Sequence, residues 1–243
     1  AAYIHKLANT LQSAAVSDDW QAQEVVILPP IPYLGLAAAL LDHPSLALGV
    51  QMVSGHDSGS RTGCYDARMA AEIGASYVCI GHSERRSYCG DDNEQIVNQY
   101  MQTVQAGLRP ILCVGETVQE RQAGQTLRVI ERQLTAVFSA DIFKKVPVHD
   151  IIVAYEPVWA IGAKSAACIE DVEDVFSYLN DRLKHNKTFA SIKLCYGGSV
   201  DETNCDQFMR SSTISGLLVG RACLDASRFA KLVTRHKTLC WQD

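Results

Sequence analysis

Short apolar runs alternate along the chain with longer segments in which apolar residues recur at helical spacing. Ile96, Tyr100 and Val104 form one such helical pattern. Polar residues do not alternate within the apolar runs, which favours parallel strands that are buried on both faces. We therefore predict an α/β protein with about seven strands, at Val25–Leu28, Leu46–Val50, Tyr77–Ile80, Pro110–Val114, Ile151–Tyr155, Ile192–Tyr196 and Gly216–Val219.

Polar or glycine-rich sequence follows nearly every predicted strand. The segments are Gln51, "GHSERR", "GETVQER", "EPVWAIG", "GGSV" and "GRA". A ring of such loops is how an α/β barrel builds its site at one face, whereas an open doubly wound sheet concentrates its chemistry at one switch point. The pattern favours the barrel and leaves the open sheet as the alternative. No Ser-, Gly- or Pro-rich linker divides the chain, so we predict one domain over residues 1–243.

Composition narrows the class of protein. The 243 residues are 47% hydrophobic and carry a net charge of −5, with no basic block, which argues against nucleic acid as a partner. No segment approaches the ~18 consecutive apolar residues of a membrane span. The nine cysteines are scattered singly without a CxxC pair, so neither a zinc ribbon nor a redox motif is predicted. Lone thiols inside apolar runs suit a reducing compartment, and we expect a cytoplasmic protein.

Glu156 is the first candidate for chemistry. It directly follows the apolar run Ile151–Tyr155 and precedes Pro157. At the carboxyl end of a barrel strand its side chain would face the mouth, and apolar neighbours such as Trp159 would raise its pKa toward the range of a general base. The alternative is an ordinary carboxylate at a strand–loop junction.

His82 is the second candidate, in "CIGHSERR". A helix that begins near Ser83 would point its amino-terminal dipole at the imidazole, lower its pKa and favour a neutral hydrogen-bond donor. The alternative is a hydrogen-bonded structural histidine. Glu84, Arg85 and Arg86 crowd the same turn, where one could be a site residue and the others ion pairs that brace the loops.

Glycine-bearing loops follow the last strands. "YGGSV" carries Ser199, "LVGRA" carries Gly220 and Arg221, and "GAK" carries Gly162. Glycine permits close backbone approach, so main-chain N–H groups of such loops can surround a phosphate. Two of these loops after consecutive late strands match the phosphate site of many α/β barrels, although glycine also ends many ordinary strands.

Taken together, five motifs resemble the triosephosphate isomerase family. They are "CIGHSERR" (79–86), "CVGE" (113–116), "AYEPVWAIG" (154–162), "YGGSV" (196–200) and "GLLVG" (216–220), in the family's order and near its spacing. The resemblance implies a (β/α)8 TIM barrel, usually a homodimer, that interconverts dihydroxyacetone phosphate and glyceraldehyde 3-phosphate in glycolysis and gluconeogenesis, without a metal or an organic cofactor.

The resemblance also implies roles for single residues. Glu156 matches the catalytic base and His82 the neutral electrophile, a pairing that is a standard worked case of pKa tuning. Gly162, Ser199, Gly220 and Arg221 occupy the phosphate-contact positions. Glu84 is similar to the carboxylate that holds a catalytic lysine, and the stretch from Pro157 to Ala167 to the lid that closes over substrate.

The sequence departs from the family at its start and in two loops. The family opens with a strand ending in Asn-x-Lys, whereas "AYIHKLANTLQ" (2–12) here already has a helical pattern. Because a seven-stranded barrel leaves open edges, we expect that an N-terminal segment carries this strand; the alternative is a true seven-stranded variant. The loop around Thr62, which docks the partner in the family, reads "GSRTGC", and the lid's far hinge reads "GAKSAA". A second functional hypothesis follows: an impaired or silent barrel that binds phosphorylated ligands.

Overall fold

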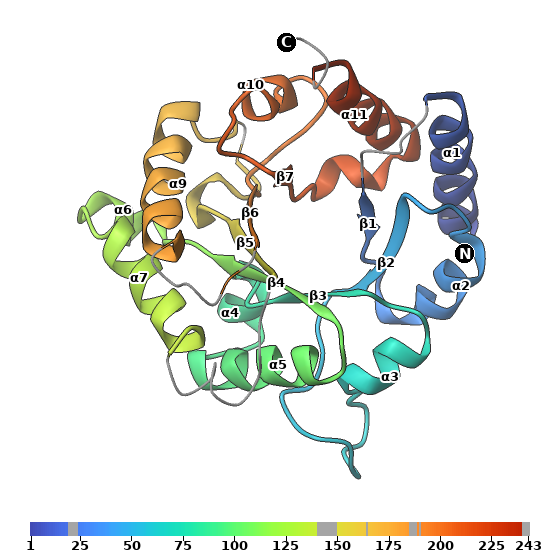
Figure 1. Cartoon of the computed structure of the whole chain (residues 1–243), viewed down its shortest axis with the longest axis horizontal. Coiled ribbons are helices and arrows are strands. Elements are labelled where there is room, and N and C mark those ends of the chain that lie inside the picture. The colour runs from blue at the N-terminus through green and yellow to red at the C-terminus, as the bar shows by residue number, and fades with distance from the viewer. Residues whose placement is uncertain (19–23, 140–149, 164, 185–188, 190, 240–243) are drawn as a thin grey trace.

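Seven parallel strands form one sheet, in which neighbours in space are also neighbours along the chain. The computed structural model describes residues 1–18, 24–139, 150–163, 165–184, 189 and 191–239. Viewed down its shortest axis, the sheet curves into a ring with the helices outside it (Figure 1). The strands are β1 (Val25–Ile27), β2 (Leu46–Val50), β3 (Tyr77–Ile80), β4 (Arg109–Val114), β5 (Asp150–Tyr155), β6 (Ser191–Tyr196) and β7 (Gly216–Leu217).

All seven predicted strands are present, and two of them end earlier than the apolar pattern predicts. Strand β1 ends at Ile27, before Pro29 and Pro30, which lack the N–H that a ladder needs. Strand β7 ends at Leu217 because its partner β6 ends at Tyr196, the residue opposite. In contrast, β5 and β6 pair over their full lengths, from Asp150–Ser191 to Tyr155–Tyr196.

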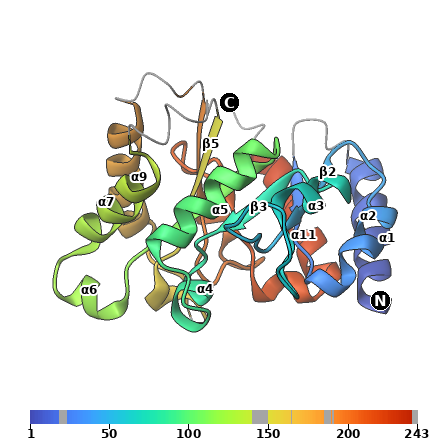
Figure 2. The same ribbon diagram turned by 90° about the horizontal axis from the view of Figure 1, so that it is seen from below.

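Helices follow the strands and cover the outer face of the sheet (Figures 1 and 2). Several begin at side-chain caps: Asp66 accepts a hydrogen bond from Met69 N, and Thr117 and Glu120 form a reciprocal capping box. The helices are α1 (Ala2–Asp18), η1 (Ile31–Tyr33), α2 (Leu34–Leu40), α3 (Ala67–Glu72), α4 (Ser83–Tyr88), α5 (Asn93–Gln105), α6 (Val118–Gln122), α7 (Thr126–Val137), η2 (Val158–Ala160), α9 (Ile169–Lys184), α10 (Cys205–Met209), η3 (Arg221–Leu224) and α11 (Ala226–Leu239).

The apolar core has two layers because successive side chains of a strand point to opposite faces. Val78 and Ile80 belong to the outer layer, where they pack with helical residues such as Ile96 and Tyr100. Tyr77 and Cys79, the alternate residues of the same strand, belong to the inner layer, which contains Tyr77, Cys79, Ile111, Cys113 and Ala154. The strands are therefore buried on both faces, as their apolar runs predict.

The sheet has two edges within the described residues, β1 and β7. Helices α1 and α11 pack against each other on the outside of this part of the ring (Figure 1). Leu7 and Leu11 of α1 and Phe229 and Val233 of α11 share one buried apolar cluster with β1. The predicted barrel architecture is thus confirmed, as a parallel sheet of seven strands curled into part of a barrel.

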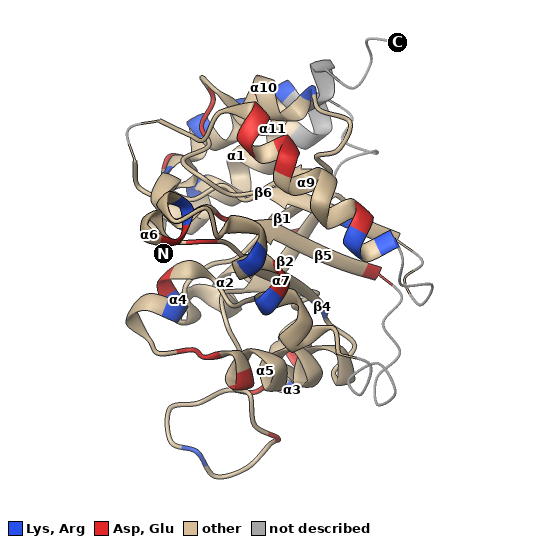
Figure 3. Cartoon of the chain, turned by 90° about the vertical axis from the view of Figure 1, so that its left-hand side faces the viewer, with Lys and Arg blue, Asp and Glu red and all other residues tan. Residues whose placement is uncertain are grey.

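A long loop between β2 and α3 extends from the body of the molecule (Figures 1 and 3). Residues 56–64 are exposed, and a hydrogen bond from Ser54 N to Tyr65 O (2.9 Å) closes the base of the loop. Acidic and basic residues are interspersed along the ribbon in the view of Figure 3. Among the described helices, none has the length and apolar character that a membrane crossing requires.

Candidate active site

Glu156 lies where β5 leaves the core. Its backbone N–H donates to the carbonyl of Val114 (2.8 Å), so the pairing with β4 extends one residue past the strand. Only 4% of Glu156 is exposed, and glycines border it on both sides. A Cβ at Gly115 would overlap the Glu156 carbonyl, and one at Gly197 would come within 3.2 Å of Glu156 Cγ. The close packing fixes the main chain under the carboxylate.

His82 lies where β3 ends, opposite Glu156. Gly81 turns the chain with a φ of +71°, and His82 then serves as the N-cap of α4. His82 Nε2 lies 3.1 Å from Glu156 Oε1, and Ser83 N donates to Glu156 Oε2 over 3.3 Å. Residues 73 positions apart in sequence therefore share one site. Figure 2 shows α4 and α6, which follow β3 and β4, at the same end of the barrel.

The electrostatics of His82 differ from the sequence-based expectation. Burial on its own would lower the pKa of His82, but the hydrogen bond and the negative charge of Glu156 outweigh burial and raise that pKa to about 9. The prediction of a lowered pKa considered the helix dipole alone and is wrong for this arrangement. Glu84 N donates to His82 Nδ1 (3.3 Å), so the proton of a neutral ring belongs on Nε2, facing Glu156.

Arg86 fixes the turn at Gly81 that precedes His82. Its Nε donates to Gly81 O (2.8 Å) and one of its terminal nitrogens donates to Cys113 O (3.2 Å), so it joins the ends of β3 and β4. Burial lowers the pKa of Arg86. A cavity of about 230 Å³ reaches Glu156 from the side of α4, α6 and α7, and Arg86, Asn93 and Gln133 are among the residues that line it.

The predicted phosphate loops meet next to this pair. Ser199, which follows β6, donates from Oγ to Ala160 O (2.8 Å) and has a positive φ of 47°. Arg221, which follows β7, donates to Ala163 O (3.2 Å). Gly162 has a φ of +70°, and Gly220 directly precedes η3. The structure therefore brings together the three loops that the sequence names.

Glu84 is placed differently. Its side chain is 67% exposed, and its Oε2 lies 3.9 Å from His82 Nδ1. It lies at the rim of the site, on the side of His82 away from Glu156.

A second buried carboxylate, Glu116, was not predicted as a site residue. It follows β4 and is fully buried. Trp159 Nε1 donates to its Oε1 (2.8 Å), the Tyr155 hydroxyl lies 3.2 Å from both carboxylate oxygens, and Arg121 lies 3.8 Å away. Arg121 also stacks over the Trp159 ring, 4.4 Å from its centroid. The only sequence signal was a glutamate one residue beyond an apolar run, in "CVGE".

The far end of the 157–167 segment, which the sequence predicts to be a lid, is held by Tyr196. Ala167 N donates to the Tyr196 hydroxyl (3.0 Å), which in turn donates to Gly198 O (3.1 Å). A Cβ at Gly198 would overlap that hydroxyl, which explains a glycine at this position. Both ends of the 157–167 segment are thus joined to neighbouring strand ends. Lys164, inside the segment, lies outside the described residues.

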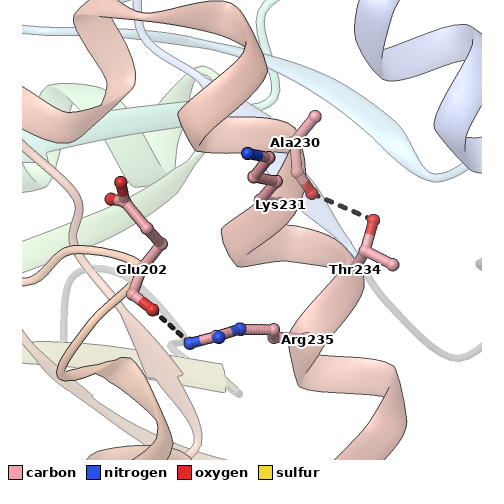
Figure 4. Close-up of a pocket in the computed structure, with 5 residues that line it drawn as sticks. All are labelled: Glu202, Ala230, Lys231, Thr234 and Arg235. Atoms are coloured by element: carbon pink, nitrogen blue, oxygen red, sulfur yellow. Dashed lines mark hydrogen bonds between the residues drawn. The ribbon is translucent and has the colours of Figure 1, made fainter.

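A cavity of about 470 Å³ lies elsewhere, beside α11 (Figure 4). Its lining includes Glu202, Lys231 and Arg235, and its polar groups bond with one another: Arg235 donates to the Glu202 main-chain carbonyl and Thr234 Oγ1 to Ala230 O. Neither His82 nor Glu156 lines it. We assign the candidate active site to the strand ends, where an acid, an imidazole and glycine-rich loops converge.

Comparison with known proteins identifies the family of this chain. The sequence pattern of the family described as triosephosphate isomerase matches residues 1–236. The chain is 39% identical over 230 residues to a triosephosphate isomerase of Herminiimonas arsenicoxydans, covering 93% of this chain and 92% of that protein. It is 38% identical over 234 residues to that of Paracidovorax citrulli (96% and 90%). The crystal structure of triosephosphate isomerase from Bartonella henselae matches with a TM-score of 0.81 at 30% identity, covering 95% and 93%. On this evidence, the chain belongs to the triosephosphate isomerase family.

Proposed function

We propose that this chain catalyses the interconversion of dihydroxyacetone phosphate and D-glyceraldehyde 3-phosphate. The observation that carries the proposal is the contact between His82 Nε2 and Glu156 Oε1 (3.1 Å) at the carboxyl ends of two parallel strands. The two substrates differ only in which of two adjacent carbons bears the carbonyl. Their exchange therefore needs one group that moves a carbon-bound proton and another that manages the proton on oxygen.

Glu156 is the proposed base. In the present arrangement its carboxylate faces His82 and the Ser83 N–H, so it must turn toward the substrate to reach the carbon. Pro157, which follows it, begins the lid, so closure of the lid and movement of the carboxylate are linked through one backbone segment. The carboxylate removes the proton from one carbon and returns it to the neighbouring carbon.

His82 is the proposed electrophile. When Glu156 turns away, the Nε2–H of the neutral ring is left facing the site, where it can donate to the substrate carbonyl oxygen. The negative charge that raises the pKa of His82 also moves away at that step, so the ring returns toward its ordinary pKa and toward the neutral form. The intermediate is an enediolate, in which the oxygen next to His82 carries the developing charge.

The phosphate group is proposed to bind at Gly162, Ser199, Gly220 and Arg221. Main-chain N–H groups of glycine-rich loops suit a dianion, and the three loops already contact one another through Ala160, Ala163 and Arg221. Glu84 is proposed as a supporting carboxylate at the rim. The reaction moves protons only, so the proposed chemistry calls for neither a metal nor an organic cofactor.

We also infer a homodimer that forms through the loop around Thr62. The support is the exposure of residues 56–64 on a loop that extends beyond the barrel (Figure 1). A dimer should have twice the 26.6 kDa of one chain by light scattering. A cytoplasmic location is proposed from the thiols: Cys79 and Cys113 lie with their sulfurs 3.6 Å apart, in hydrogen-bond contact and without a disulfide, which suits a reducing compartment. The single continuous sheet supports one domain over residues 1–243.

An assay of the purified chain tests the proposed activity. Dihydroxyacetone phosphate is supplied, and formation of glyceraldehyde 3-phosphate is followed by its oxidation with a coupled dehydrogenase that produces NADH. We expect a turnover within about 10² of the 1–10³ s⁻¹ of ordinary enzymes. A rate no higher than the solution rate would contradict the proposal. Binding of a phosphorylated analogue without turnover would favour the silent barrel instead.

A further inference from the structure

Gly115 is the main-chain neighbour of Glu156, the proposed base. The segment from Val114 to Glu116 runs beside the start of the lid: Glu156 N donates to Val114 O (2.8 Å) and Val158 N donates to Glu116 O (3.0 Å). A Cβ at Gly115 would overlap the carbonyl of Glu156. The backbones at positions 115 and 156 are therefore packed directly together, and a shift of one displaces the other.

Gly115 has no strand on its other side. The β3–β4 ladder ends at the pair Ile80 and Leu112, because β3 turns away at Gly81. Gly115 is partly buried, so its N–H and C=O need partners in place of a neighbouring strand. Gln133 of α7 supplies both: its Oε1 accepts from Gly115 N (2.9 Å) and its Nε2 donates to Gly115 O (3.1 Å).

The side chain of Gln133 thus takes the place of a strand at this position. An amide presents one acceptor and one donor side by side, as a peptide group does, and asparagine and glutamine are the residues that carry an amide in the side chain. Gln133 is 7% exposed and lies among the apolar residues Ile130, Leu134 and Val137 of the buried face of α7. An amide in this apolar stripe is explained by the two hydrogen bonds it makes.

We propose that Gln133 is a positioning residue for Glu156. In this role Gln133 does not touch the substrate. It fixes the position of the Gly115 backbone, and the main chain of Glu156 packs against that backbone. The inference rests on the proposed function, because it concerns the base of that reaction. Catalysis by a positioned base is sensitive to geometry, and a displacement of about 1 Å can cost on the order of 10² in rate.

A purely structural role for Gln133 makes a different prediction. Helix α7 is also joined to α9, where the Tyr178 hydroxyl and Arg182 Nε donate to Glu131 (2.7 and 2.9 Å). If Gln133 only anchors α7, its loss should resemble the loss of one of these links. Tyr178→Phe is therefore a matched control, because it removes a hydrogen bond of α7 without touching Gly115.

The first measurement is the kinetics of Gln133→Met, which keeps the length of the side chain and removes the amide. We expect kcat to fall by about 10- to 10²-fold, with KM for dihydroxyacetone phosphate within about threefold of the wild-type value, because the phosphate loops lie on other strands. Tyr178→Phe should lower the melting temperature and leave kcat within about twofold. Equal kcat values for the two variants would overturn the proposal.

The second measurement uses Gln133→Glu, which also decides the question if the methionine variant does not fold. An ionised carboxylate cannot donate to Gly115 O, whereas a protonated carboxyl group presents one donor and one acceptor like the amide it replaces. The ratio of variant to wild-type kcat should therefore rise as pH falls from 8 to 5 toward the pKa of the introduced group. A ratio that does not change with pH would overturn the proposal. An inactive wild-type chain would overturn the proposed function itself. An active wild-type chain with an unchanged ratio would overturn only the role of Gln133.

Discussion

The carboxyl ends of β4 and β5 carry the same kind of residue in two different states. Glu156 directly follows β5, Glu116 follows β4 after one glycine, and both are almost completely buried. Glu116 is bonded by Trp159 Nε1 and the Tyr155 hydroxyl, with Arg121 close by. Glu156 contacts the imidazole of His82 and accepts one long hydrogen bond from Ser83 N.

The difference shows how a buried carboxylate is either fixed or left able to move. Burial of a charge is costly unless hydrogen-bond donors surround it. The donors around Glu116 surround its carboxylate where it now lies, so movement of the carboxylate would break these bonds. Glu156 has fewer partners, and one of them, His82, is itself able to lose its proton. A carboxylate with this environment can leave its position at low cost, which a proton carrier needs. Glu116 in turn holds Trp159, which lies in the segment proposed as the lid.

Replacement of Glu156 is expected to have the largest effect. Glu156→Gln keeps the shape of the side chain and removes the base, so kcat should fall by about 10²–10⁴-fold, the range contributed by a positioned general base. The measurement is the coupled assay with dihydroxyacetone phosphate. Binding of glycerol 3-phosphate, which has the phosphate but no carbonyl, should stay within about threefold. A variant that retains more than a tenth of the wild-type kcat would remove Glu156 from the mechanism.

The sequence predicts the strands and the two central site residues for a physical reason. Buried parallel strands appear as apolar runs, and Glu156 and His82 are polar residues that stand just beyond the ends of two such runs. The shortened ends of β1 and β7 depend on prolines and on the length of a partner strand, which are matters of pairing rather than of local pattern.

The rest of the site depends on contacts that no local pattern contains. Glu116, like Glu156, comes soon after an apolar run, and the positions of Trp159, Tyr155 and Arg121 distinguish the surroundings of the two carboxylates. Gln133 sits at an apolar position of a helix and is separated by 18 residues from the glycine it bonds. The predicted direction of the His82 pKa shift is wrong because the sequence shows where the helix starts but not that the Glu156 carboxylate lies 3.1 Å from the imidazole.

Replacement of Glu116 is expected to act on stability rather than on chemistry. Glu116→Gln replaces a charged acceptor by a neutral amide, so the bonds with Trp159 Nε1 and Tyr155 lose their charge assistance and Arg121 loses a nearby negative charge. We expect the free energy of unfolding in urea, followed by circular dichroism, to fall by about 1–3 kcal/mol. The loss in kcat should be smaller than about 10-fold. A loss of kcat comparable to that of Glu156→Gln, with unchanged stability, would show that the two carboxylates do not have separate roles.

The smallest expected effect is on the pH dependence of stability. The pKa of His82 is raised in the folded chain from the ordinary 6.5 to about 9, so the folded state holds this proton more tightly than the unfolded state does. The stabilisation from the pair with Glu156 is therefore fully present below pH 6.5 and is lost as pH rises through about 9. We expect a contribution on the order of 1 kcal/mol, because the His82 side chain is 28% exposed and the pair is partly screened by solvent.

The Glu156→Gln variant isolates this contribution from other groups that titrate over the same range. Without the carboxylate, the main cause of the raised His82 pKa is removed, while Cys79, Cys113 and the remaining groups stay in place. The free energy of unfolding of the wild-type chain should decrease between pH 6.5 and 9 by about 1 kcal/mol more than that of the variant. Equal decreases would mean that His82 and Glu156 do not interact in the free protein. The carboxylate would then keep only the hydrogen bond from Ser83 N, and the ability of Glu156 to move would need a different physical basis from the exchange of His82 for substrate.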